Sequence, residues 1–137
     1  MKRVTGIGGV FFKTPDPKKT REWYSKHLGF DTDDYGTSFE WKNNAKTPGF
    51  TAWSTFGEGS DYFGEGGQVF MINYRVADLE ALIKVLKEEG VQVVKEIEIY
   101  EYGKFAHILD CDGLRLELWE PYDEEFDKMI SARTKPE

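Results

Sequence analysis

The stretch Tyr102–Pro121, YGKFAHILDCDGLRLELWEP, determines how the rest of this chain can be arranged. It predicts two antiparallel strands joined by a three-residue loop at Cys111–Gly113. Such loops combine a type I turn with a left-handed residue, a conformation that glycine adopts without steric strain. This register places His107 directly opposite Glu117.

The two faces of this predicted hairpin differ, because side chains alternate between the faces of a strand. The first face is apolar and typical of a core: Ala106, Ile108, Leu114, Leu116 and Leu118. The second face mixes aromatic and titratable side chains: Phe105, His107, Leu109, Arg115, Glu117 and Trp119. Because titratable groups are costly to bury without partners, we expect this second face either to line a polar and aromatic concave surface or to lie in solvent.

The composition favours a single folded domain. The chain has 137 residues, of which 39% are hydrophobic and 15% aromatic, enough to build a core. Its net charge of −7, without a cluster of Lys and Arg, argues against nucleic-acid binding. The one cysteine, Cys111, excludes an internal disulfide, and with no recognisable secretory signal this favours a cytoplasmic location. No apolar run approaches the ~18 residues of a membrane span.

One structural unit occurs twice along the chain. Asp16 and Asp78, 62 residues apart, are each placed to cap a helix, and Gly29 and Gly90, 61 residues apart, are each placed to end one. This nearly constant offset indicates an internal repeat. Since neither half can bury its sheet alone, we expect both to share one continuous curved sheet, with helices outside and a cleft inside.

The expected boundaries follow from turn chemistry and side-chain alternation. Module one covers about residues 5–57, a linker rich in glycine and acid covers 58–67, module two covers about 68–121, and a tail covers 122–137. The expected strands are residues 5–13, 30–35, 38–42, 50–56, 68–76 and 91–99, followed by the hairpin. The linker is expected to be mobile. The tail predicts either a helical turn on the body or on a second subunit, or a frayed terminus.

These segments together resemble the vicinal oxygen chelate superfamily, which includes glyoxalase I, bleomycin-resistance proteins and extradiol dioxygenases. The resemblance is carried by residues 6–30, GIGGVFFKTPDPKKTREWYSKHLGF, by residues 73–91, NYRVADLEALIKVLKEEGV, and by the hairpin. In the hairpin, Cys111 and Leu114 replace the Pro and Asn of the family pattern. The resemblance implies an α+β fold, in which two β-α-β-β-β modules form one cupped mixed sheet around a cleft.

In metal-dependent members of this superfamily, four strands each supply one ligand to a divalent ion. The resemblance places Glu117 at one of these positions, but it places Gly9 and Met71 where histidine is usual, with Asn73 nearby. The last strand of module one offers no strong ligand. Hard divalent ions bind several oxygen or imidazole donors, and Glu117 with His107 opposite falls short. We therefore expect no metal and no cofactor, and a divalent metal held by non-standard ligands is the alternative.

An aromatic cleft is expected to bind the ligand. The candidate ligand-binding residues are Phe11, Trp41, Trp53, Met71, Phe105, His107, Arg115, Glu117 and Trp119. Such a lining suits a flat or apolar molecule, and a collapsed aromatic core is the alternative. His107 and Glu117 are the candidate catalytic pair for acid–base chemistry. The alternative for His107 is a hydrogen-bonded structural role. The alternatives for Glu117 are a structural pairing with Arg115 or His107, or a contact with a cationic or hydroxyl group of a ligand.

Three functions follow from these features, and the sequence does not decide whether the protein is an enzyme. The first is metal-free binding of a small aromatic or apolar molecule, in the manner of bleomycin-resistance proteins. The second is a metal-dependent glyoxalase-like lyase, isomerase or dioxygenase with non-standard ligands. The third is a homodimer whose cleft is an assembly surface. A small molecule and a second copy of the chain are thus the expected partners, whereas nucleic acid and membranes are not.

Overall fold

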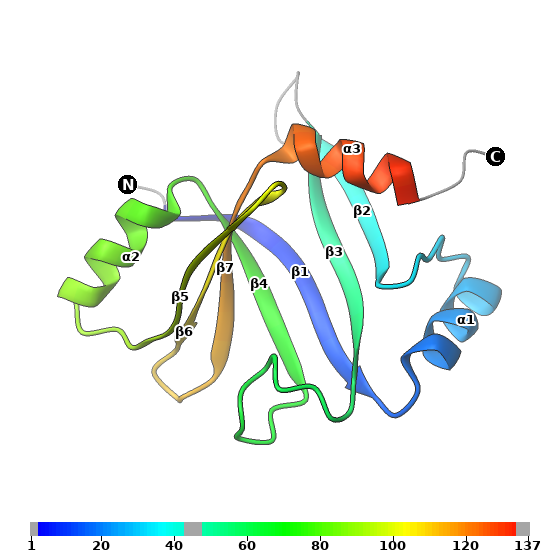
Figure 1. The fold of residues 1–137 in the computed structure, drawn as a ribbon, viewed down its shortest axis with the longest axis horizontal. Coiled ribbons are helices and arrows are strands. Elements are labelled where there is room, and N and C mark those ends of the chain that lie inside the picture. The colour runs from blue at the N-terminus through cyan, green and yellow to red at the C-terminus, as the bar shows by residue number, and fades with distance from the viewer. Residues whose placement is uncertain (1–2, 43–47, 134–137) are drawn as a thin grey trace.

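A computed structural model describes residues 3–42 and 48–133. Seven strands form one curved mixed sheet in the order β2-β3-β1-β4-β7-β6-β5 (Figure 1). The strands are β1 Val4–Thr14, β2 Gly36–Lys42, β3 Pro48–Gly57, β4 Phe70–Val76, β5 Val93–Tyr100, β6 Gly103–Leu109 and β7 Arg115–Pro121. The helices are α1 Pro17–Leu28, α2 Leu79–Glu88 and α3 Asp123–Arg133. The α+β fold with one shared curved sheet is confirmed.

The two modules meet at the centre of the sheet, where β1 pairs antiparallel with β4. β1 also pairs in parallel with β3, and β4 pairs in parallel with β7, so the strands that begin and end each module are neighbours. Module two has the four expected strands. Module one has three, because residues 30–35 form no strand.

The helix boundaries follow the predicted capping residues. Asp16 accepts a hydrogen bond from the backbone of Lys19 at 3.1 Å, and Asp78 accepts one from Ala81 at 3.1 Å. These bonds satisfy backbone N–H groups that have no partner inside the helix. Gly29 adopts the left-handed conformation with φ of 72°, which ends α1.

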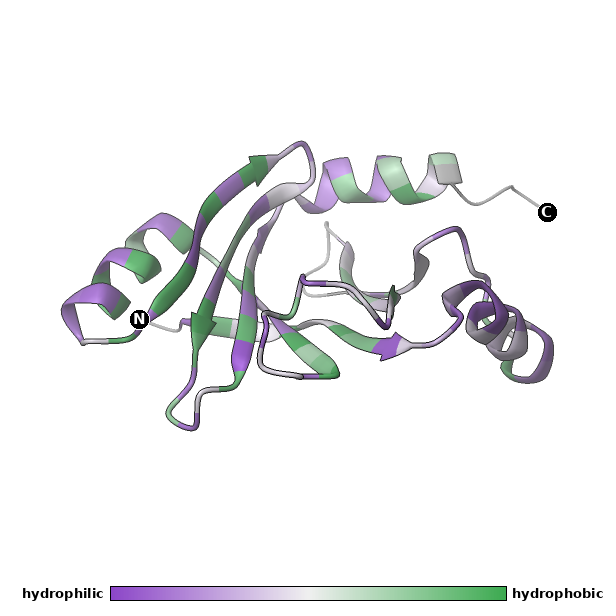
Figure 2. Cartoon of the chain, turned by 60° about the horizontal axis from the view of Figure 1, so that its bottom comes forward, coloured by the Kyte–Doolittle hydropathy of each residue, from purple (hydrophilic) through white to green (hydrophobic). Residues whose placement is uncertain are grey.

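The helices cover the sheet in different places. α1 and α2 lie at opposite ends of the sheet, and α3 crosses near β3 (Figure 1). The apolar face of the hairpin is a core face, as predicted, and packs against α2 in a core of Val76, Leu79, Leu82, Ile83, Ala106, Ile108 and Leu118. Figure 2 shows hydrophobic and hydrophilic residues alternating along the strands of this half. The opposite, mixed face of the hairpin is left facing the inside of the curved sheet.

Two segments outside the modules close over that inner face. The expected linker folds inward instead of forming a free connection: Phe63 is 1% exposed and packs with Phe11 and Met71. The tail forms α3, whose Phe126 packs on Phe50 and Trp119. The helix on the body of the protein is therefore the correct alternative for the described part of the tail, and residues 134–137 lie outside the described residues.

The first residue of α3 is tied to the sheet by a buried ion pair. Arg75, 3% exposed, donates to both carboxylate oxygens of Asp123, at 3.0 and 2.7 Å. A planar guanidinium and a carboxylate match in this two-bond geometry. Among the described residues, no helix has the length and apolar character needed to cross a membrane.

Candidate functional site

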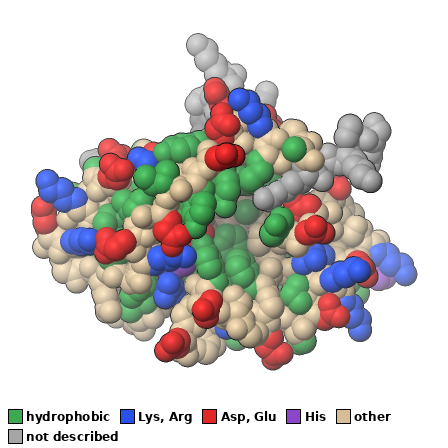
Figure 3. Space-filling view, viewed as in Figure 1, with side chains coloured by type: hydrophobic (Ala, Val, Ile, Leu, Met, Phe, Trp, Pro, Cys, Tyr) green, Lys and Arg blue, Asp and Glu red, His purple; other side chains and the backbone are tan. Residues whose placement is uncertain are grey.

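A cavity of about 400 Å³ lies between the inner face of the sheet, the loop that follows β3, and α3. Figure 3 shows apolar side chains gathered in a hollow near the centre of the molecule, with charged groups around it. The aromatic lining comes from both modules, the loop and α3, and consists of Phe11, Tyr35, Phe56, Tyr62, Tyr100, Tyr102, Phe105, Trp119 and Phe126. Polar lining residues include Asp33, Ser54, Asn73 and Glu117. The cavity therefore combines an apolar wall with a few polar groups.

Glu117 lies at the floor of this cavity and is 1% exposed. Because β7 pairs with both β4 and β6, the register places Asn73 and His107 directly opposite Glu117, one on each side. The predicted pairing of His107 with Glu117 is confirmed. The carboxylate accepts hydrogen bonds from Asn73 Nδ2 at 2.6 Å, from His107 Nε2 at 2.8 Å and from the hydroxyl of Tyr62. Three donors thus offset the loss of water around a buried carboxylate.

The ring of His107 is held in one tautomer by its two partners. Arg115 Nε donates to His107 Nδ1 at 2.8 Å, and a guanidinium has no acceptor atom. Nδ1 must therefore be the acceptor, which leaves the ring proton on Nε2, where it is donated to Glu117. Both nitrogens of a neutral imidazole are then in use. This arrangement favours the structural interpretation of His107 over the catalytic one.

Tyr62 comes from the loop between β3 and β4, and it is a site residue that sequence reasoning did not predict. Its ring stacks on Phe56 with centroids 5.4 Å apart and meets the ring of His107 edge-on at 5.0 Å. Burial and the neighbouring Glu117 carboxylate raise the pKa of Tyr62 above its ordinary value. The hydroxyl therefore keeps its proton near neutral pH and remains a donor to Glu117. The sequence feature that could have indicated its role is the aromatic pair Tyr62-Phe63, which stands in a segment otherwise rich in glycine and acidic residues.

Asn73 carries an acceptor that is not used. Its Nδ2 donates to Glu117, while its Oδ1 is buried and has no hydrogen-bond partner among the described groups. Rotating the amide by half a turn would direct Oδ1 at the carboxylate, so the observed orientation is the favourable one. Oδ1 lies over Gly8, at an irregularity in the pairing of β1 with β4, and a Cβ at Gly8 would meet it at 2.0 Å. Only glycine leaves room for this amide.

The structure brings most of the predicted site residues together. Phe11, Phe105, Glu117 and Trp119 line the cavity. Met71 packs against Phe11 in the core beside it, and His107 and Arg115 stand behind Glu117 in a chain of hydrogen bonds.

Two tryptophans do not line the cavity, which corrects their predicted placement. Trp53 packs on Phe12 and Tyr24, with ring centroids 5.5 and 4.7 Å apart, on the face that α1 covers. The cavity face of β3 carries Ala52, Ser54 and Phe56 instead. The ring of Trp41 lies over the guanidinium of Arg75, 4.9 Å from its centre, and its Nε1 donates to Thr51. These contacts fix Trp41 away from the cavity.

Comparison with known proteins agrees with this architecture. The family model described as the Glyoxalase/Bleomycin resistance protein/Dioxygenase superfamily matches residues 6–118. The chain belongs to this superfamily. A comparison with curated proteins finds no match.

Several solved structures share the fold of this superfamily member. One is a Streptomyces coelicolor methylmalonyl-CoA epimerase in complex with 2-nitronate-propionyl-CoA, with 17% identity and a TM-score of 0.65, where the match covers 87% of this chain and 99% of that one. Another is methylmalonyl-CoA epimerase from Mycobacterium tuberculosis, with 24% identity and a TM-score of 0.59, covering 93% and 95%. At these identities the likeness shows the fold alone.

The donor set does not fit the divalent ion that metal-dependent members of the superfamily hold. Both oxygens of Glu117 already accept hydrogen bonds from side chains. His107 donates from Nε2 to Glu117, and its other nitrogen, Nδ1, accepts a hydrogen bond from Arg115. The neighbouring strands present Gly8 and Ser54 to the cavity, and neither is a strong ligand.

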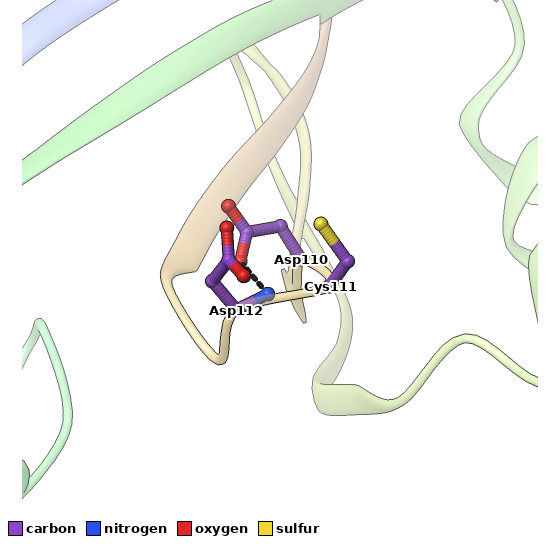
Figure 4. A group of neighbouring side chains, drawn as sticks. All are labelled: Asp110, Cys111 and Asp112. Carbon is purple, nitrogen blue, oxygen red and sulfur yellow. Dashed lines mark hydrogen bonds between the residues drawn. The ribbon is translucent and has the colours of Figure 1, made fainter.

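Within the described ranges, one group of His, Cys, Asp or Glu has three ligand atoms close together: Asp110, Cys111 and Asp112 (Figure 4). It lies in the loop of the hairpin. Asp110 Oδ1 accepts hydrogen bonds from the backbone of Asp112 and Leu114, each at 2.9 Å, and Gly113 has φ of 83°. The group therefore forms the predicted turn, in which aspartate side chains commonly bond to their own backbone.

Proposed function

We propose that this protein binds a small, largely aromatic molecule in the cavity above Glu117 and does so without a metal ion. The observation that carries the proposal is the carboxylate of Glu117, fixed by three side-chain donors at the floor of an aromatic cavity of about 400 Å³. That volume lies within the usual range for small-molecule sites, which combine apolar walls with a few fixed polar groups.

The state of the polar groups supports binding over acid–base catalysis. A general base needs a lone pair that can reach the proton it removes. Both nitrogens of His107 are engaged with protein groups, and Tyr62, Asn73 and His107 take three of the about four acceptor positions of the Glu117 carboxylate. The epimerases that share the fold act on a CoA thioester, and transfer of that activity to this chain would require a free base at this site.

The position of α3 supports binding over assembly through the cleft. Phe126, Met129 and Ile130 of the same chain line the cavity. A second copy that used this surface would have to displace them and the ion pair between Arg75 and Asp123. A homodimer formed through another surface is compatible with the proposal.

A thermal-shift screen with aromatic compounds tests the proposal. A ligand present at one hundred times its Kd stabilises the native state by about 2.7 kcal/mol, which raises Tm by roughly 8 °C for a chain of this size. Tryptophan fluorescence then locates the site. Binding is expected to change the emission of Trp119, so the signal is lost in Trp119→Phe and kept in the matched variant Trp53→Phe.

Two results would contradict the proposal. One is a screen in which no aromatic compound raises Tm. The other is a fluorescence response that follows Trp53, because that ring lies on the opposite face of the sheet. Sedimentation of the same samples would show whether any response comes from a change of assembly instead.

A further inference from the structure

The polar floor of the cavity has an unused hydrogen-bond acceptor, whereas its donor groups are each engaged with Glu117. Its three donors, on Tyr62, Asn73 and His107, all point at Glu117. What remains is an acceptor, Asn73 Oδ1, which is buried and has no partner among the described groups. An anionic ligand needs donors to replace the water it loses. A ligand that itself carries N–H donors matches this floor.

The charges around the cavity also favour a cationic ligand over an anionic one. Among the described residues that line it, Asp33 and Glu117 are charged, and no Lys or Arg is present. Nearby cations are engaged elsewhere: Arg75 with Asp123, and Arg115 with His107. Lys95 lies over the ring of Tyr62, 4.6 Å from its centre, and pairs with Glu98 at 3.1 Å.

The aromatic side chains that line the cavity also favour a cationic ligand. Phe105 and Trp119 stack with centroids 5.7 Å apart, and both line the cavity. Aromatic faces attract cations, most strongly where water is excluded. The net charge of −7 also raises the local concentration of cations around the protein.

Resting on the function proposed above, we propose that the ligand is an aromatic molecule with a protonated nitrogen, and that the cavity rejects anions. The ammonium or amidinium group lies at the floor, toward Asn73 Oδ1 and Glu117, and the ring lies against the aromatic wall. Acyl-CoA thioesters, which carry several phosphate charges, are disfavoured by the carboxylates of Asp33 and Glu117 and by the absence of Lys and Arg from the described lining. In this respect the site differs from that of the epimerase that was solved with an acyl-CoA analogue.

Three probes with one ring system and three charges test this inference: tryptamine, indole-3-ethanol and indole-3-acetate, each titrated calorimetrically into the native protein. Tryptamine is expected to bind at least about tenfold more tightly than indole-3-acetate, since the two differ in sign beside a carboxylate at an effective dielectric constant of about 20. Indole-3-ethanol is expected to lie between them, and propionyl-CoA is expected not to bind.

A variant that keeps the ring packing sharpens the test. Tyr62→Phe removes one donor from Glu117 and so leaves a lone pair on the carboxylate beside the cavity. It is expected to increase the preference for tryptamine over indole-3-acetate. Tyr24→Phe, which makes the same chemical change in α1, where the ring packs on Trp53, is expected to leave that preference unchanged.

The outcomes separate this inference from the proposed function. Equal affinity for the three indoles, or tightest binding of the acetate, overturns the inference and leaves small-molecule binding intact. Binding of propionyl-CoA also overturns it. If none of the indoles binds at millimolar concentration, the inference fails, and the proposed function fails as well only if no compound in the wider aromatic screen raises Tm.

Discussion

The substitution Glu117→Gln tests whether hydrogen bonds hold the buried carboxylate. Glutamine keeps the shape of the side chain, removes its charge and replaces one acceptor oxygen with a donor. In the native protein Oε2 accepts from Tyr62 and His107, and Oε1 accepts from Asn73. With glutamine, one of these donors faces another donor unless Asn73 turns its amide.

The expected loss follows from the strength of these bonds. Hydrogen bonds to a charged group contribute about 1.5–3 kcal/mol each, and neutral ones about 0.5–1.5 kcal/mol. Two bonds weakened by about 1 kcal/mol each, with the third lost or rearranged, are partly offset by the lower desolvation cost of a neutral side chain. We expect a net destabilisation of about 2 kcal/mol.

Urea unfolding at neutral pH measures this loss, with an expected decrease in midpoint of roughly 1 M. The matched control Glu88→Gln makes the same charge change on an exposed position of α2 and is expected to stay within about 0.5 kcal/mol of the native protein. A Glu117→Gln variant as stable as the native protein, or more stable, would refute the reasoning. That result would mean that the buried charge lacks compensating donors.

The remaining predictions concern the parts that surround Glu117. Gly8→Ala is expected to lower the free energy of unfolding, measured in urea, by about 1–3 kcal/mol, because its Cβ has no room. Gly6→Ala, whose Cβ would have its nearest neighbour 4.0 Å away, is expected to be tolerated. Equal stability of the two variants would contradict this. The pKa of Tyr62 is raised, so the native state keeps a proton that the unfolded chain releases above about pH 10. Stability is thus complete below that pH and falls by about 1.4 kcal/mol per pH unit above it, and Tyr62→Phe, unfolded in urea between about pH 9 and 11, is expected to lack this part of the slope. Asp123→Ala leaves Arg75 buried without its carboxylate, so a loss of about 3 kcal/mol and faster amide exchange in α3 are expected, and unchanged exchange in α3 would argue against an anchoring role.

Local patterns in the sequence were enough to predict the frame of the site. The hairpin register follows from its turn and from alternation, so His107 was correctly placed opposite Glu117. The helix caps at Asp16 and Asp78 depend on a few neighbouring residues, and their spacing revealed the repeat. These features are decided within short segments of chain.

The rest of the site depends on contacts between distant segments, which the sequence did not show. Tyr62 reaches Glu117 because its neighbour Phe63 is buried beside Phe11, and a segment with four glycines gives no sign of this. The face on which Trp53 lies is set by the parallel pairing of β1 with β3, since alternation within one strand leaves both choices open.

Metal analysis of the purified native protein tests the central claim most directly, because it asks whether side chains or an ion hold Glu117. The protein is dialysed with each of several divalent ions, washed and analysed, and its unfolding is measured with and without a chelator. The account predicts far less than one ion per chain and a Tm that the chelator does not change. One tightly bound ion per chain, lost in Glu117→Gln and needed for full stability, would contradict it.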